Sequence, residues 1–309
     1  MPVKSQTQRH PTNRPWWRII SRIQGGLGNQ LFIYASSIEL GHRLGLPVRF
    51  DTVSAFRRDT FERRYELAEM GIKLTPANPL ESLRLRGRSI LVRYMQKLEA
   101  RRPLGERHFL CQGSANDCEI LEPQDRKRWL YMDGYWQDFR FFDRRRPGLM
   151  EIAHQARVRR AEELAKWRGS RSVGIHVRQL VGYSASGRWV YDAKPILTMD
   201  YYLAALHQVV QQVPIDVVLL FGDDHEFRQR LAASVHNSLK IGTKVIEGSS
   251  SVADLLLMTC CDALVLSPST FAWWAAYLNP AARIIVHPGV RDNGAPFPTP
   301  ENWRILQPL

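Results

Sequence analysis

Hydrophobic runs of strand length alternate with longer amphipathic segments in the first fifty residues of the chain. Residues 18–24 form a β-rich run, residues 25–28 are rich in glycine, and residues 46–51 form a second run of strand type. Between them, hydrophobic side chains recur at helical spacing from Asn29, a residue that favours helix N-caps, to Gly45. The pattern predicts a βαβ unit with its glycine-rich loop at the carboxyl end of the first strand.

A longer alternation of the same kind begins at Ser172. Because strands and helices alternate there, this part of the chain predicts a mostly parallel sheet covered by helices. The predicted strands span residues 172–177, 215–221, 243–247, 262–267 and 282–287, and the predicted helices span residues 200–213, 251–261 and 270–278.

The two alternations divide the chain into an early and a late part. Residues 52–130 between them are less regular, and residues 131–143 are dense in aromatic side chains. The sequence therefore predicts an α/β protein with two Rossmann-like domains, residues 17–168 and residues 169–309, that face one another. Residues 1–16 are polar and basic, and we expect them to form a flexible tail.

The composition is that of a globular protein with a strong positive charge. Hydrophobic residues make up 44% of the 309 residues, and the formal net charge is +13. A basic surplus favours anionic partners, which include nucleotide phosphates, nucleic acid and acidic membrane surfaces. The arginines are scattered and no RRM or helix-turn-helix signature occurs, so a basic nucleic-acid-binding protein is the alternative rather than the leading interpretation.

The cysteine content and the hydropathy of the chain indicate the cellular compartment in which the protein is expected. The four cysteines fit no zinc pattern and are too few for a disulfide scaffold, which favours a reducing cytoplasm. No segment reaches the roughly 18 apolar residues of a membrane span. The first twenty residues also lack the apolar core of a secretory signal. We therefore expect a cytoplasmic protein.

Residues that suit phosphate binding follow two of the predicted strands. Gly26 and Gly28 precede a helix, where backbone amides attract an anion, although a tight βα turn needs the same residues. His176 and Arg178 close the strand at 172–177. An arginine there can bind a phosphate bidentately, whereas His176 is either a nucleotide contact or a buried core histidine.

Three further groups have a functional and a structural interpretation. Asp223 and Asp224 follow a strand and either hold a base, ribose or metal ion, or cap the next helix. Ser269 and Thr270 lie between a strand and a helix, which suits either a phosphate or ordinary helix capping. Asp254 stands in an otherwise apolar helix, either exposed near its start or directed at a partner. No sequence pattern for a metal site or a hydrolase triad occurs.

Seven segments, taken together and in this order, resemble glycosyltransferase family 11, the α-1,2-fucosyltransferases. The likeness runs from about Ile23 to Leu306. Its segments are GGLGNQLFIYA (25–35), GYWQ (134–137), GIHVR (174–178), MDYY (199–202), FGDD (221–224), DLLLM (254–258) and SPSTFAWWAAYLN (267–279). An ordered set of this kind is far more specific than a single glycine-rich loop.

The resemblance implies a fold, a reaction and partners. The fold would be GT-B-like, with two Rossmann-like domains facing across a cleft, the first on the acceptor side and the second holding GDP-fucose. The enzyme would invert the anomeric centre, need no metal ion or cofactor, and transfer fucose to the 2-hydroxyl of a galactose-type residue. The expected acceptor is a galactose-containing oligosaccharide, including lipid-linked forms, and peripheral contact with the inner face of a membrane belongs to the same expectation.

The resemblance also implies roles for individual residues. Arg178 would stabilise the departing diphosphate, and Asn29 would line the cleft near the sugar, so both are counted as catalytic. Asp254 would fix the guanosine. The donor-binding residues implied are Gly26, Gly28, His176, Asp223, Asp224, Asp254, Ser269 and Thr270.

One segment departs from the family pattern. The family typically reads HVRRGDY, whereas this chain reads HVRQLVGY over residues 176–183. Gln179 replaces the second arginine, and the acidic position is either Val181 or displaced by an insertion. The general base for the acceptor hydroxyl is therefore unassigned, with Asp192 as a candidate replacement. A family member that binds a nucleotide sugar with weak or altered activity is therefore a further alternative.

Overall fold

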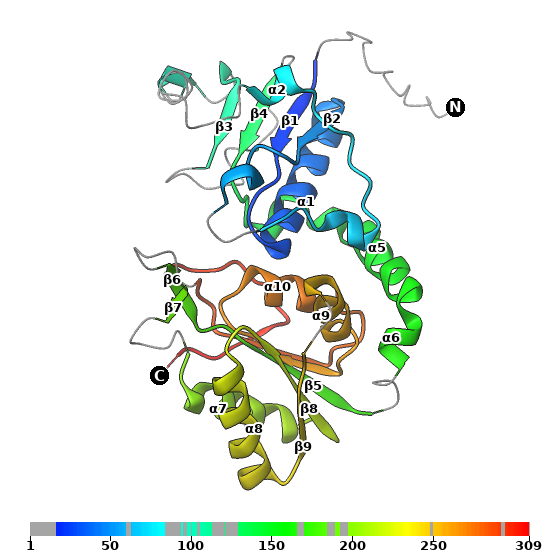
Figure 1. Cartoon of the computed structure of the whole chain (residues 1–309), viewed down its shortest axis with the longest axis vertical. Coiled ribbons are helices and arrows are strands. Elements are labelled where there is room, and N and C mark those ends of the chain that lie inside the picture. The colour runs from blue at the N-terminus through cyan, green and yellow to red at the C-terminus, as the bar shows by residue number, and fades with distance from the viewer. Residues whose placement is uncertain are drawn as a thin grey trace, which may run out of the picture.

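The computed structural model describes residues 17–59, 63–83, 94, 98–99, 101–103, 106–112, 121, 129–165, 170–183, 189–191, 197–247, 250–291 and 294–308. All of its strands except those of one short hairpin form two parallel sheets, one in each half of the chain, and the two halves are stacked one above the other in Figure 1. The predicted tail over residues 1–16 lies outside the described residues.

The first half is built on a four-stranded parallel sheet in the order β2-β1-β4-β3. Its strands are β1 (Ile19–Arg22), β2 (Val48–Asp51), β3 (Phe109–Cys111) and β4 (Leu130–Asp133). Helix α1 (Leu27–Leu44) connects β1 to β2, so the predicted βαβ unit is confirmed. The shorter elements that the structure describes in this half include η1 (Phe56–Arg58), η2 (Leu67–Met70) and α2 (Pro79–Leu83).

The start of α1 differs from the prediction. The N-cap is Gly26, whose extended backbone (φ −73°, ψ 174°) leads directly into the helix at Leu27. Asn29 therefore lies in the first helical turn, and the prediction that it caps the helix was wrong. Gly45 ends the helix as expected, because its φ of +65° is a left-handed conformation that glycine adopts at low cost.

A helical segment joins the two halves along one side of the molecule (Figure 1). It comprises η4 (Phe139–Phe141), η5 (Asp143–Arg145), α5 (Arg146–Arg159) and α6 (Ala161–Ala165). The predicted domain boundary at 168/169 falls within residues 166–169, which are not described, so the boundary remains a prediction.

The second half contains a six-stranded parallel sheet in the order β12-β11-β10-β5-β8-β9. All six residues of β5 are buried, because it lies inside the sheet with helices on both faces. A two-stranded antiparallel hairpin, β6 (Leu180–Tyr183) and β7 (Trp189–Tyr191), follows β5. The strands of the large sheet are β5 (Ser172–Val177), β8 (Val217–Gly222), β9 (Gly242–Val245), β10 (Ala263–Val265), β11 (Ile284–His287) and β12 (Arg304–Ile305).

Helices cover the two faces of this sheet differently. The outer face packs on α7 (Met199–Val210) and α8 (His225–Leu239), through a core that includes Val173 and Ile175 of β5. The inner face packs on α9 (Ser251–Met258) and α10 (Thr270–Tyr277), which lie between the sheet and the first half in Figure 1.

The two halves share one hydrophobic core. Phe32 of α1 contacts Trp273 and Trp274 of α10, with ring centroids 4.8 Å and 5.1 Å apart. The same buried cluster continues from the first sheet through α9 and α10 to Leu219 and Phe221 of β8. The GT-B-like prediction of two facing Rossmann-like units is confirmed, and the units are in direct apolar contact.

Candidate functional site

A cavity of about 390 Å³ lies between the two halves, within the size range of small-molecule sites. The first half lines it with Gly26, Leu27, Gly28, Asn29, Arg63, Glu66 and Gln137. The second half lines it with His176, Arg178, Gly222, Asp223, Ser251, Asp254, Pro268, Ser269, Thr270, Phe271, Arg291 and Phe297.

The cavity lies where the strand order of both sheets reverses. In the second half, β5 leads to β8 on one side, and the chain later returns to place β10 on the other side. In the first half, β1 has β2 on one side and β4 on the other. The crevice at the carboxyl ends of such strands is the usual ligand site of open α/β sheets, and here both crevices open onto one cavity.

Three helices begin at the cavity. Gly26 is the N-cap of α1, Ser250 of α9 and Ser269 of α10, and the first residues of all three helices belong to the lining. The first amides of a helix lack intrahelical acceptors and carry partial positive charge. No side-chain hydrogen bond caps α1 or α10, whereas Ser250 accepts from the Ala253 amide at 3.2 Å. The arrangement is suited to binding an anion.

Gly28 lies where α1 meets α10. A Cβ atom on this residue would lie 2.5 Å from the Phe271 backbone nitrogen and 2.5 Å from the Thr270 carbonyl carbon. A Cβ atom on Gly26, by contrast, would have no heavy atom within 4 Å. Gly28 thus allows two helix N-termini to touch, so that their amides face the same cavity.

Arg178 and Asp223 lie at the ends of adjacent strands and form an ion pair. The Arg178 Nη1 and Asp223 Oδ2 atoms are 3.2 Å apart, and 35% of the arginine side chain is exposed. Asp223 Oδ1 also accepts from the Gln179 backbone amide at 3.0 Å. The ion pair with Asp223 therefore orients the Arg178 side chain, which lines the cavity and remains partly exposed.

His176 is a buried, neutral histidine beside the cavity. Its Nδ1 lies 2.7 Å from Ser267 Oγ, which joins the ends of β5 and β10. Burial lowers the pKa of His176 to about 3, and the charges of Arg178 and Arg228 act in the same direction. The ring therefore carries no charge near neutral pH and serves as a hydrogen-bonding group.

Of the three aspartates expected beside the nucleotide, Asp223 pairs with Arg178, and the other two, Asp254 and Asp224, occupy different environments. Asp254 lies in the first turn of α9 and lines the cavity, and burial raises its pKa to about 6 against the opposing charge of Arg228. Asp224 is absent from the cavity lining. Its carboxylate caps α8 by accepting from the Phe227 amide at 2.9 Å, as the capping interpretation requires.

Gln137 and Arg291 line the cavity without having been predicted to do so. Gln137 Nε2 donates to Asn29 Oδ1 at 2.8 Å, and Arg291 donates to both the side-chain and the backbone oxygen of Gln137. Asn29 is thereby held by a chain of contacts that crosses from the first half to the second. Gln137 belongs to the GYWQ segment, whereas Arg291 lies in an irregular segment that carries no periodic signal.

Gln179, which departs from the family pattern, is absent from the cavity lining. It is buried, and its Nε2 donates to the Leu197 carbonyl oxygen at 3.0 Å. This contact ties the end of β5 to the segment that precedes α7. Val181 lies in β6, and Asp192 lies outside the described residues.

Within the described part of the chain, no group of three or more His, Cys, Asp or Glu residues is placed to hold a metal ion. The described helices also include none that is long and apolar enough to cross a membrane.

Comparisons with known proteins agree on one family. The model for glycosyl transferase family 11 matches residues 117–297. An alpha-1,2-colitosyltransferase of Escherichia coli is 25% identical over 84% of this chain and 87% of its own length. An Escherichia coli O-antigen biosynthesis glycosyltransferase, WbnK, is 23% identical over 87% of this chain and 93% of its own length.

A solved structure supports the fold. The structure of an Arabidopsis thaliana FUT1 mutant in complex with GDP has a TM-score of 0.50 at 14% identity, covering 90% of this chain and 72% of that chain. The family model spans more than half of the chain. The matched residues include β5 and β10, the neighbouring strands at which the strand order of the second sheet reverses. The chain is a glycosyltransferase and belongs to glycosyltransferase family 11.

Proposed function

We propose that the chain transfers fucose from GDP-fucose to the 2-hydroxyl of a galactose-type residue in a glycan, with inversion at the anomeric carbon. One observation carries the proposal: the N-termini of α1, α9 and α10 and the guanidinium of Arg178 converge on one cavity that both halves line. Fixed amides and a permanent cation stabilise a departing diphosphate without a metal ion.

The donor fits the second half of the cavity. Ser269, Thr270 and the first amides of α10 would receive the diphosphate beside Arg178. Asp254 would accept hydrogen bonds from the guanine edge, because a carboxylate there can pair with two neighbouring N–H groups of the base. Such a pair of donors would also offset the cost of burying the charged form of Asp254.

Arg178 would act on the leaving group. As the bond from the fucose anomeric carbon to the phosphate oxygen breaks, its electron pair passes to GDP, and the negative charge on the diphosphate grows. A guanidinium already held by Asp223 would meet that charge without reorganising. Asn29, fixed by Gln137, would contact the sugar from the opposite side of the cavity.

The relatives support the linkage and the type of product. One is named an alpha-1,2-colitosyltransferase and the other an O-antigen biosynthesis glycosyltransferase. We therefore propose an acceptor of the O-antigen or related polysaccharide type, including lipid-linked oligosaccharides. We also propose a cytoplasmic location and contact with the membrane surface.

The experiment that tests the function offers purified protein GDP-fucose and, in parallel, GDP-colitose, with galactose-terminated acceptors. We expect GDP release that depends on the acceptor, and an α-linked product substituted at the 2-hydroxyl, identified by NMR. A folded protein that releases no GDP with any acceptor contradicts the proposal. Faster transfer from GDP-colitose would leave the proposed mechanism unchanged but would make colitose, rather than fucose, the transferred sugar. Salt-dependent binding to DNA or RNA without any GDP binding would favour the nucleic-acid alternative.

A further inference from the structure

Glu66 is a carboxylate on the first-half side of the cavity. Three carboxylates line the cavity among the described residues, and two of them, Asp223 and Asp254, belong to the second half, where the donor is proposed to bind. Glu66 lies immediately before η2 and is partly buried. Among the described lining residues, it is therefore the carboxylate that the first half contributes, and the family resemblance makes that half the acceptor side.

The backbone of Glu66 is held by a buried glutamine of the glycine-rich motif. Gln30, which is fully buried, donates from Nε2 to the carbonyl oxygens of Gly25 at 2.9 Å and Arg64 at 2.8 Å. Its Oε1 accepts from the Glu66 amide at 2.9 Å. One side chain thus fixes residues 64–66 against the loop that begins α1, and a reactive group on this segment would be held in place.

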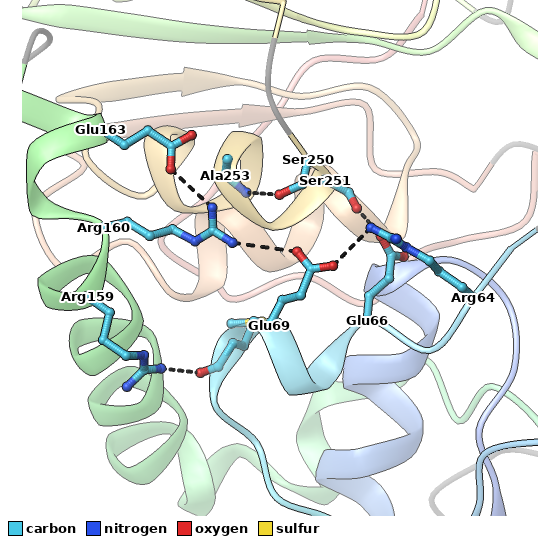
Figure 2. Close-up of polar contacts among 10 residues, drawn as sticks. Arg64, Glu66, Glu69, Arg159, Arg160, Glu163, Ser250, Ser251 and Ala253 are labelled. Carbon is cyan, nitrogen blue, oxygen red and sulfur yellow. Dashed lines mark hydrogen bonds and ion pairs between the residues drawn. The ribbon is translucent and has the colours of Figure 1, made fainter.

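The side chain of Glu66 is anchored by one oxygen only. Ser251, the first residue of α9, donates its hydroxyl to Glu66 Oε1, as Figure 2 shows. Among the described residues, none forms a hydrogen bond or ion pair with the other oxygen, Oε2. Glu69, three residues on, differs because it pairs with Arg64 at 3.0 Å and with Arg160 at 3.5 Å (Figure 2). It is also absent from the cavity lining.

We propose that Glu66 is the general base that takes the proton from the attacking hydroxyl of the acceptor, a role that rests on the proposed glycosyl transfer. The acceptor oxygen forms a bond to the anomeric carbon while its proton moves to Glu66 Oε2. The bond between that carbon and the diphosphate breaks, and GDP leaves with the electron pair. The proton then passes from Glu66 to water.

The other acid–base groups of the cavity suit this step less well. Asp223 already holds Arg178 and the Gln179 amide, so its oxygens are engaged on the donor side. His176 uses Nδ1 to contact Ser267, and its low pKa makes it a weak base. Asp254 lies on α9 in the second half, where the proposed function gives it the guanine.

The test is Glu66→Gln in the full-length protein, with Glu69→Gln as the matched control from the same segment. The amide oxygen of glutamine can still accept from Ser251, and the backbone bond to Gln30 is unchanged, so the variant removes the base while keeping its anchors. We expect kcat to fall by about 10²- to 10⁴-fold, the usual worth of a positioned general base. GDP affinity, measured by calorimetry, should stay within about twofold, and Glu69→Gln should keep both values.

The outcomes separate this role from the proposed function. Turnover of Glu66→Gln within about threefold of wild type overturns the role, and so does a loss of GDP affinity in proportion to the loss of kcat. Restoration of part of the rate in Glu66→Asp, with GDP affinity unchanged, would support it. A wild-type protein that binds GDP and transfers to no acceptor contradicts the proposed function itself, and the role with it.

Discussion

At the scale of single residues, Asp254 shows that the cavity places an acidic group where its charge is disfavoured. Burial raises its pKa from 3.8 to about 6, so the folded protein holds this proton more tightly than the unfolded chain does. The contribution of Asp254 to stability is therefore most favourable below about pH 4 and declines as the pH rises towards 6 and above.

We predict that Asp254→Asn matches the wild type in stability near pH 4 and becomes the more stable protein above pH 6. The reason is that asparagine never carries the charge that burial disfavours. Urea denaturation without ligand at pH 4, 5, 6 and 7 checks this, and a difference in unfolding free energy between the two proteins that does not change with pH would refute it.

The same variant, Asp254→Asn, should bind GDP roughly tenfold to a hundredfold more weakly, since a hydrogen bond to a charged acceptor is worth about 1.5–3 kcal/mol.

At the scale of elements, the contact between α1 and α10 depends on the absence of a side chain at Gly28. We predict that Gly28→Ala lowers the free energy of unfolding by about 1–3 kcal/mol, as overpacking usually does, because the new methyl group overlaps the backbone of Thr270 and Phe271. Gly26→Ala is the control from the same loop, because its methyl group meets no atom within 4 Å. Equal stability of the two variants would contradict the packing described here.

Some of the strands and helices can be predicted from the sequence pattern, and others cannot. The strands that end at the cavity are predictable, because buried parallel strands form continuous apolar runs bounded by polar or glycine residues. Helix α8 was not predicted, although Phe227, Leu231 and Val235 recur on its buried face. Short strands such as β3 and β4 give little periodic signal, and only their pairing with β1 and each other defines them.

The residues that line the cavity likewise include some that the sequence predicts and some that it does not. Arg178 and Ser269 follow predicted strands, so their place at the sheet edge could be expected before the structure was known. Glu66 and Arg291 lie in irregular segments, and tertiary contacts with Gln30 and Gln137 bring them to the cavity. Asn29 reaches the cavity as predicted, but from the first helical turn rather than as the cap.

At the scale of the whole molecule, the two Rossmann-like halves are joined by a shared hydrophobic core rather than by a hydrated polar interface. The aromatic side chains of α10 are buried against α1 and against η4, where Phe139 lies 5.9 Å from Trp273 between ring centroids. Separating the halves would expose this cluster, at a cost of about 25 cal/mol for each Å² of apolar surface.

We predict that both halves unfold in one transition. Far-UV circular dichroism and tryptophan fluorescence should report the same midpoint during thermal unfolding, because Trp273 and Trp274 lie in the core that both halves build. Saturating GDP should raise that midpoint, by the equivalent of about 2.7 kcal/mol at a concentration one hundred times the dissociation constant. Two separated midpoints would show that the halves are independent.

The central claim is that the cavity between the halves binds a guanosine diphosphate through helix N-termini and Arg178. Calorimetric titration of the wild type and of Arg178→Ala with GDP, UDP and ADP tests it most directly. We predict that the wild type binds GDP in preference to UDP and ADP. We also predict that Arg178→Ala, with an unchanged melting temperature, loses at least about thirtyfold in GDP affinity, from roughly 2 kcal/mol of charge-assisted binding. A preference for UDP, or an unchanged GDP affinity in Arg178→Ala, would contradict it.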